Sequence, residues 1–242
     1  MLTKWHPDMP DEYKNRIVTG DARELAKRIP DESVDLVFTD PPYPKEYLYL
    51  YDWLGEIAAR VLKPTGFLLT YLGVYWKQEV MKRLSQSMDY YFDFVLENAG
   101  KSPIMWQRKV ISRHKSIMAW TRKDTDPKPY TNILSLWRGG GEDKRYHTWG
   151  QDESSARYYI DCFSRQDHIV ADFMVGGGTT AAVCKILHRN YIAFEIDKDT
   201  AEIAQARLET TQPYLFMPQP EQLELVEKPQ TSPTHPEPCK KL

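Results

Sequence analysis

Residues 168–197 read HIVADFMVGGGTTAAVCKILHRNYIAFEID, an apolar run, three glycines, a helix-forming segment and a second apolar run that ends at Glu195. This order predicts a strand, a tight loop, a helix and a second strand. Gly176, Gly178 and Ala181 match G-x-G-x-x-[GA], where small residues let a ligand approach a helix N-terminus. An acid at about the distance of Glu195 binds ribose hydroxyls in nucleotide-binding sheets. A tight turn alone would also produce the glycines, but the combination favours an adenosine-type cofactor.

The rest of the chain continues the alternation of strands and helices. We expect a strand and then a helix within 16–30, further strands at 33–40, 67–73, 90–98, 115–122, 168–175 and 190–197, and helices at 47–62, 76–88, 155–165, 179–187 and 199–211. In the helix at 47–62 the apolar side chains fall at three- and four-residue spacings, and the turn KPTG (63–66) is expected to close it. The pattern predicts a doubly wound α/β sheet.

Composition sets limits on the function. The chain has 242 residues, a formal net charge of −2 and 41% hydrophobic residues, so one sizeable domain is expected and no global basic excess indicates nucleic acid. Cys162, Cys184 and Cys239 lie far apart in the sequence, which argues against a metal site or a disulfide framework. Without a long apolar stretch or a signal-peptide pattern, we expect a soluble, cytoplasmic protein.

Residues 39–43, TDPPY, form a rigid corner at the end of the apolar run VDLVF. Ligands of open α/β sheets lie across the carboxyl ends of the strands, so this corner should face the cofactor. The two prolines remove backbone donors and leave carbonyl oxygens as acceptors, and Asp40 adds a carboxylate. Such acceptors suit a planar amino group, and Tyr43 offers a flat face to a ring.

These motifs resemble those of the amino DNA methyltransferases, which methylate the N6 of adenine or the N4 of cytosine. TDPPY is similar to their catalytic motif, DFMVGGGTT (172–180) to their S-adenosylmethionine loop, and residues 17–43 to their N-terminal block. The catalytic motif precedes the cofactor loop, which is the circularly permuted order of the β group. The resemblance covers roughly residues 15–210. It implies a circularly permuted, Rossmann-like S-adenosylmethionine-dependent methyltransferase sheet.

The resemblance also implies a role for each matching residue. The catalytic residues would be Asp40, Pro41, Pro42 and Tyr43, with Asp40 and the Pro41 carbonyl holding the target amino group and Tyr43 stacking on the base. The cofactor-binding residues would be Asp21, Gly176, Gly178, Thr179, Thr180 and Glu195. Asp21 would accept from the cofactor's adenine and Glu195 would bind its ribose. An acid rather than Ser before PPY favours adenine, so we expect a site-specific DNA adenine-N6 methyltransferase that acts on a flipped base.

A basic segment agrees with a DNA partner. No acidic residue lies between Glu97 and Asp124, whereas Lys101, Arg108, Lys109, Arg113 and Lys115 all fall there, with Trp106 among them. Such charges would contact the phosphates of double-stranded DNA, although an ordinary solvated hairpin could carry the same cluster. Dimers are common in this family, so a homodimer is possible, and neither a membrane nor a metal partner is expected.

The predicted domains follow from the motifs. A methyltransferase domain would cover 1–211, made of a catalytic half (15–123), a short variable or recognition segment (124–153) and a cofactor half (154–211). Residues 212–242 are rich in Pro, Gln, Glu, Thr and Ser, which predicts a disordered C-terminal tail.

The chain departs from the family pattern at the cofactor loop. Phe173 and Gly177 stand where the family has Pro and Ser, and HTWGQDESS (147–155) keeps His147 and Gln151 but lacks a Lys-Pro pair. Three alternatives therefore stay open: a cytosine-N4 or RNA amino methyltransferase, a catalytically inactive DNA-binding subunit, and a nicotinamide oxidoreductase, which would leave DPPY without a role.

Overall fold

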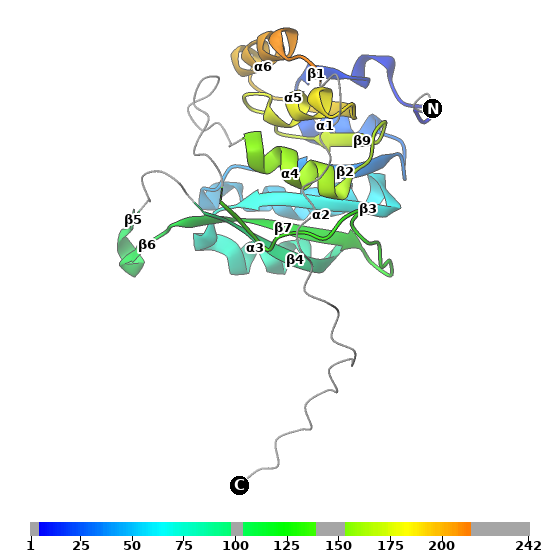
Figure 1. Ribbon diagram of the computed structural model, residues 1–242. Helices are drawn as coiled ribbons and strands as arrows, with labels where there is room; N and C mark the ends of the chain where they lie inside the picture. The colour runs from blue at the N-terminus through cyan, green and yellow to red at the C-terminus, as the bar shows by residue number, and fades with distance from the viewer. Residues whose placement is uncertain (1–4, 98–103, 139–152, 214–242) are drawn as a thin grey trace.

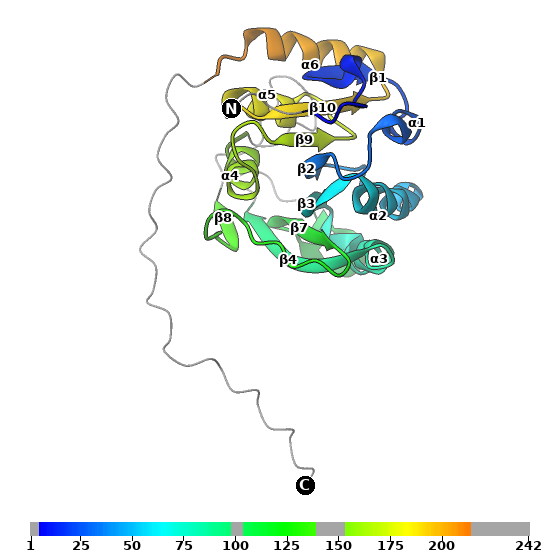
Figure 2. The same ribbon diagram turned by 90° about the vertical axis from the view of Figure 1, so that its right-hand side faces the viewer.

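A computed structural model describes residues 5–97, 104–138 and 153–213. The main sheet has eight strands in the order β1-β10-β9-β2-β3-β7-β4-β8 (Figures 1 and 2). Neighbours from β1 to β3 run parallel, β7 is antiparallel to both β3 and β4, and β8 is parallel to β4. The predicted α/β class is thus confirmed, with a parallel half that carries the two sequence motifs.

The strands and helices have the following bounds. The strands are β1 (Arg16–Thr19), β2 (Val34–Thr39), β3 (Leu62–Leu72), β4 (Met88–Glu97), β5 (Ile104–Met105), β6 (Val110–Ile111), β7 (His114–Arg122), β8 (Leu136–Arg138), β9 (Ile169–Asp172) and β10 (Asn190–Glu195). The α-helices are α1 (Ala22–Leu25), α2 (Tyr49–Val61), α3 (Lys77–Leu84), α4 (Glu153–Phe163), α5 (Thr179–Ile186) and α6 (Lys198–Thr210). Single 3₁₀ turns are η1 (Asp11–Tyr13), η2 (Ala26–Arg28), η3 (Lys45–Tyr47), η4 (Val74–Trp76) and η5 (Trp106–Arg108).

The helices cover both faces of the sheet and bury its apolar side chains. Residues of α1, α2 and α3 pack in one core cluster, and residues of α4, α5 and α6 pack in a second cluster on the opposite face. Figure 2 shows the two layers of helices with the sheet between them. Strand β2 is buried along its whole length, as its continuous apolar run predicts. No helix in the described residues is long and apolar enough to cross a membrane.

Several sequence-based boundaries are wrong: α3 ends at Leu84 rather than at residue 88, β9 ends at Asp172 rather than at residue 175, and both ends of α2 differ as well. The predicted helix at 47–62 begins only at Tyr49, Tyr47 is exposed in η3, and Leu62 already belongs to β3. The turn KPTG lies inside β3, because Leu62 pairs with Val34 and the register shifts before Phe67 pairs with Leu36. A long-range strand pair therefore overrides the local turn signal. The sequence reading also missed three short strands, β5, β6 and β8.

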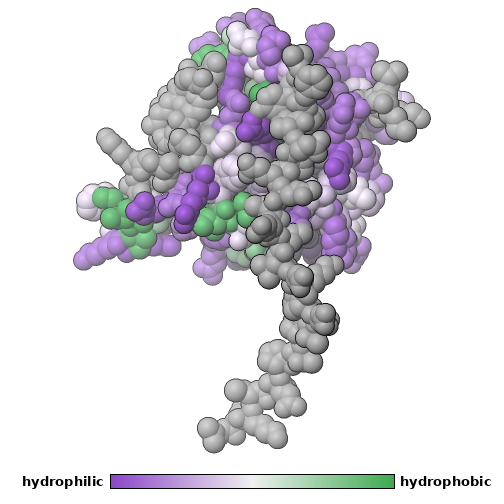
Figure 3. Space-filling model, viewed as in Figure 1, coloured by the Kyte–Doolittle hydropathy of each residue, from purple (hydrophilic) through white to green (hydrophobic). Residues whose placement is uncertain are grey.

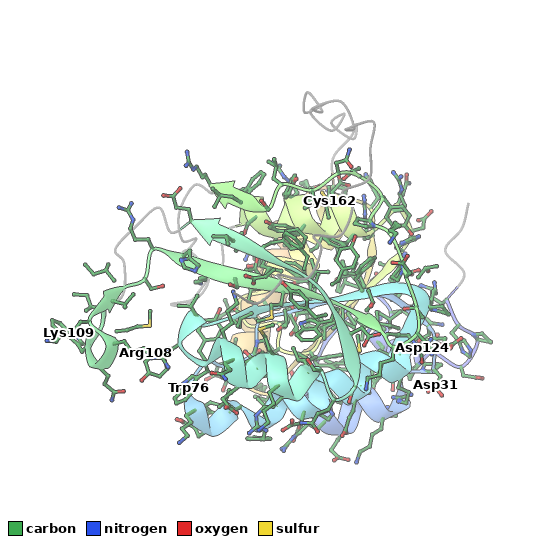
Figure 4. The ribbon with its side chains drawn as sticks, turned by 90° about the horizontal axis from the view of Figure 1, so that it is seen from below. Asp31, Trp76, Arg108, Lys109, Asp124 and Cys162 are labelled. Carbon is green, nitrogen blue, oxygen red and sulfur yellow. The ribbon has the colours of Figure 1, made fainter. Side chains whose placement is uncertain are left out.

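The strand directions bring distant segments to one edge. Parallel strands β1, β10, β9, β2 and β3 all end at this edge, and β7 begins there because it is antiparallel, with His114 opposite Glu97 of β4. Strands β5 and β6 form a separate two-stranded unit that projects from the same end, as Figures 1 and 4 show. In Figure 4, Arg108 and Lys109 lie at the end where Trp76 lies, whereas Asp31 and Asp124 lie at the opposite end. The predicted domain boundaries stay a prediction, and residues 214–242 lie outside the described residues.

Gly178 sets the distance between the glycine loop and α6. Its φ is +80°, and a Cβ at this position would lie 3.0 Å from the Cβ of Ala204. Gly176 has φ +49°, but a Cβ there would meet no atom within 4 Å. Both positions favour glycine through their backbone conformation, and Gly178 also requires it for helix packing.

Replacing each of these glycines by alanine separates the effect of the backbone conformation from the effect of packing against α6. Gly176→Ala should lower the free energy of unfolding by about 1 kcal/mol, the cost of a left-handed Ala residue. Gly178→Ala should lower it by about 2–4 kcal/mol, because the clash with α6 adds to that cost. Urea denaturation of both variants tests this, and equal losses would contradict the packing role of Gly178.

Candidate active site at the carboxyl edge of the sheet

A cavity of about 870 Å³ opens at the carboxyl edge of the parallel strands. Asp40, Pro41, Pro42 and Tyr43 line it from the end of β2, and Gly176 lines it from the loop after β9. Asp21, after β1, and Glu195, at the end of β10, complete its polar wall. The two motifs therefore meet in one space, which is large enough for a drug-sized or nucleotide-sized ligand.

The corner at the end of β2 partly shields the Asp40 carboxylate and the Tyr43 hydroxyl from water. Pro41 is buried and Asp40 is half-buried. Burial, followed by the charge of Asp40, raises the pKa of Tyr43 well above its ordinary value, and the same two causes raise the pKa of Tyr51. Both hydroxyls hence stay protonated beside the Asp40 carboxylate. A carboxylate in such surroundings is a stronger acceptor than one in water.

A buried hydrogen bond joins the corner to the glycine loop. Thr39, directly before Asp40, donates from its hydroxyl to Oδ1 of Asp172 at 2.8 Å. The same oxygen accepts from the backbone N–H of Met174 at 3.1 Å, and Thr180 also hydrogen-bonds this carboxyl. Burial is the main reason that the pKa of Asp172 rises to about 6, and the negative charge of Asp40 adds to it. Asp172 thus sits between the two halves of the site.

Glu195 fixes the opening of the glycine loop. Its Oε2 accepts from the backbone N–H of Gly176 at 2.9 Å, and its Oε1 accepts from that of Asp197 at 3.1 Å. At the end of the adjacent strand, Asp21 caps α1 by accepting from the N–H of Arg23 at 2.9 Å. Hydrogen bonds from the Arg23 guanidinium are the main cause that lowers the pKa of Asp21. The two acids are therefore held as acceptors on one wall of the cavity.

Arg207 braces the loop from behind and was missed by the sequence reading. The buried guanidinium donates to the carbonyl of Gly177 at 3.1 Å, to Oγ1 of Thr179 at 2.9 Å and to Glu153 of α4 at 2.8 Å. A signal was present in the sequence, because Arg207 falls in helical phase with Ala204, on the buried side of α6. It holds the loop by charge-assisted hydrogen bonds without lining the cavity.

Aromatic side chains form the other wall of the cavity and were also missed. Tyr49 and Trp53 come from α2, and Tyr75 and Trp76 come from η4. Trp53 packs edge-on to Phe173, with ring centroids 5.6 Å apart, and Phe173 stacks against Phe194. Phe173, which replaces the Pro of the family pattern, is thus a buried anchor of the loop. An apolar, aromatic wall suits the flat face of a base.

Not every predicted site residue reaches the cavity. Gly178, Thr179 and Thr180 lie behind the loop, where they contact α6, Arg207 and Asp172 respectively. Lys115 lines the cavity, whereas Arg108 and Lys109 lie on the projecting unit and Arg113 is exposed between that unit and β7. Lys101, His147 and Gln151 lie outside the described residues.

The two described cysteines lie in the core of the protein. Cys162 and Cys184 are buried, as expected of core residues, and Cys239 lies outside the described residues. No cluster of potential metal ligands is found in the described part of the chain.

Comparison with solved structures identifies the fold. The cytosine-N4-specific PvuII DNA methyltransferase superposes with a TM-score of 0.69 at 21% identity, covering 79% of this chain and 85% of that one. The complex of M1.HpyAVI with SAM gives a TM-score of 0.67 at 22% identity, covering 80% and 99%. At these identities the likeness shows the fold, which is that of the S-adenosylmethionine-dependent DNA methyltransferases.

Sequence comparison points to the same kind of protein. A family model described as DNA methylase matches residues 105–206. The type II methyltransferase M.HpaI of Haemophilus parainfluenzae is 26% identical over 239 residues, 81% of this chain and 74% of that protein. M.HinfI of Haemophilus influenzae is 27% identical, covering 84% and 70%. The chain is therefore similar to the amino DNA methyltransferases, the group with adenine-N6 and cytosine-N4 members.

The raised pKa of Asp172 predicts a pH dependence of stability. The folded protein binds this proton more readily than the unfolded chain, because the pKa is about 6 against an ordinary 3.8. The charged carboxylate consequently costs stability above pH 6, and that cost is relieved as the pH falls toward 4.

Asp172→Asn removes this titration. Relative to the variant, the wild type should gain up to about 3 kcal/mol in free energy of unfolding as the pH falls from 7 to 4. Denaturant unfolding of both proteins at several pH values measures the difference. Two parallel curves would show that Asp172 does not carry a raised pKa.

Proposed function

We propose that the protein is an adenine-N6 DNA methyltransferase that uses S-adenosylmethionine and acts on a base flipped out of double-stranded DNA. The observation that carries this proposal is the meeting of Asp40 and Pro41 with Gly176 and Glu195 around one cavity. An acceptor pair for an amino group and a loop for a nucleoside cofactor are then within reach of each other. Asp40, the acid before PPY, supports adenine as the target, because amino DNA methyltransferases with an acid at this position favour adenine over cytosine.

The cavity fits the cofactor on its own geometry. Gly176 lines it with a left-handed backbone, and the space where a Cβ would lie is open, so a ligand can approach the loop closely. Asp21 and Glu195 supply acceptors for the adenine amino group and the ribose hydroxyls. Ile196, exposed beside Glu195, offers an apolar contact for the adenine ring. When bound, S-adenosylmethionine supplies an electrophilic methyl group on a sulfonium centre.

The chain's residues prepare the target nitrogen. An exocyclic amino nitrogen is a poor nucleophile because its lone pair is delocalised into the ring. Asp40 and the Pro41 carbonyl would accept its two N–H groups, which favours tetrahedral geometry and frees the lone pair. The positive charge that develops on the nitrogen would be stabilised by the Asp40 carboxylate. Holding the base against Tyr43 supplies alignment and offsets part of the cost of flipping.

The second candidate is cytosine-N4 methylation. A solved structure with the same fold is titled cytosine-N4-specific, and both bases present a planar amino group. A catalytically inactive DNA-binding subunit is a weaker alternative, since Phe173 packs as a buried anchor and leaves Gly176 open to the cavity. Dimerisation stays a prediction.

The direct test is methyl transfer from labelled S-adenosylmethionine to mixed-sequence duplex DNA, followed by digestion to nucleosides. We expect labelled N6-methyladenine, and a loss of at least a hundredfold in Asp40→Ala because the acceptor of the amino group is gone. Asp89→Ala removes an exposed acid on β4 and should keep full activity. Labelled N4-methylcytosine would establish the second candidate, and no transfer despite cofactor binding would contradict both.

Cofactor binding can be tested apart from catalysis. Glu195→Gln should weaken S-adenosylmethionine binding at least tenfold in calorimetry, because the carboxylate that holds Gly176 and faces the ribose loses its charge. Asp199→Asn removes the same charge from the exposed first turn of α6 and should leave the affinity unchanged. Equal affinity of both variants would contradict the assignment of Glu195.

A further inference from the structure

The projecting unit of β5, η5 and β6, which we call the finger (Ile104–Ile111), exposes an unusual set of side chains. It forms a two-stranded sheet of its own, with Ile104 opposite Ile111 and Met105 opposite Val110. Trp106 at its tip is 78% exposed, the largest exposed fraction among the large apolar side chains of the described residues. Ile111, also on the finger, has an exposed fraction of 61%. Figure 3 shows hydrophobic atoms gathered at this projecting end.

The apolar side chains of the finger are surrounded by positive charge. Arg108 and Lys109 follow Trp106 after Gln107, and Lys109 turns the chain with a φ of +52°. Arg113 lies just beyond β6, and the sequence has no acid between Glu97 and Asp124. An exposed apolar patch of this kind marks an interaction site. The positive charge of the finger favours a polyanionic partner. The flat indole of Trp106 favours a partner with aromatic rings on which it can stack. Nucleic acid has both properties.

The finger is fastened to the rim of the cavity. The guanidinium of Arg108 lies 4.0 Å from the centre of the Tyr75 ring, and the Tyr75 hydroxyl donates to Oε1 of Gln107 at 2.7 Å. Tyr75 itself lines the cavity and packs edge-on to Trp76 at 4.9 Å. The two residues that follow Trp106 therefore contact the wall that would receive the flipped base. A duplex whose base enters the cavity would pass directly beside the finger.

We propose that Trp106 is a wedge that enters the DNA stack at the place left by the flipped base. This inference rests on the proposed function and adds the element that opens the duplex. A base that leaves the stack uncovers two apolar ring faces, and proteins that bend DNA are able to insert apolar side chains between neighbouring bases. The indole of Trp106 would stack on those faces, as aromatic side chains stack on bases. Arg108 and Lys109 would hold the flanking phosphates.

A second copy of the chain is a less suitable occupant for this surface. Two fingers that met across a two-fold axis would bring the same patch together from each side. Arg108 and Lys109 would then face their own copies without an acid of the finger to compensate them. Self-association is therefore an outcome of the test rather than the proposal.

The first measurement needs no catalysis. Wild type, Trp106→Ala and Trp106→Phe are titrated, without cofactor, with a mixed-sequence duplex and with the same duplex carrying one tetrahydrofuran abasic site. The abasic duplex already contains the gap, so the wild type should prefer it at least fivefold. Trp106→Ala should lose this preference and Trp106→Phe should retain most of it, because phenylalanine keeps a stacking ring. An equal preference in wild type and Trp106→Ala would overturn the wedge.

The second measurement uses methyl transfer to the duplex and to the same strand alone. A single strand has no gap to fill, so the ratio of duplex rate to single-strand rate should fall at least tenfold in Trp106→Ala. Circular dichroism and S-adenosylmethionine affinity show that the variant is folded. If the wild type transfers no methyl group, the proposed function is wrong. The preference of the wild type for the abasic duplex then still tests whether Trp106 acts as a wedge. A parallel loss of both rates, with a dimer that becomes a monomer in sedimentation, would assign the finger to self-association and overturn the wedge.

Discussion

The pairing of β2 with β9 is the constraint on which the site depends. Leu36 lies opposite Val170 and Val37 opposite Ala171, so two segments far apart in the sequence run side by side and end together. The hydrogen bond from Thr39 to Asp172 then closes this junction directly beneath the cavity. Any shift in the register of the two strands would separate Asp40 from the glycine loop. The circularly permuted order of the motifs leaves this junction intact, because the chain enters the same sheet at a different strand.

The sequence was sufficient for the parallel half of the fold because that half is specified locally. Continuous apolar runs predicted β2, β9 and β10, and helical spacing predicted α2 to α6. The turn KPTG was misread because strand pairing to β2, set by residues far away in the sequence, carries β3 through it. Strands β5, β6 and β8 contain two or three residues each, which is too short for a periodic signal.

Site residues that belong to a single motif could be predicted from the sequence. Site residues that several segments bring together could not. Asp40, Tyr43, Gly176 and Glu195 could be chosen from short stretches, and they line one cavity. The support of Arg207 and the aromatic wall depend on how α6, α2 and η4 pack, which no local pattern contains. Gly178 was chosen from the same pattern, and its missing side chain makes room for Ala204, while its role in cofactor binding stays a prediction.

The pairing of β1 with β10 has a consequence for synthesis on the ribosome. Asn15, just before β1, accepts a hydrogen bond from Tyr191 across a separation of 176 residues. The corner TDPPY is translated early, but β2 lacks its neighbour β9 and β1 lacks its neighbour β10 until those two later strands have left the exit tunnel. Such a late closure exposes unpaired strands while the chain is still growing. The same order delays assembly of the cavity until almost all the described chain exists, so incomplete nascent chains lack the complete cavity.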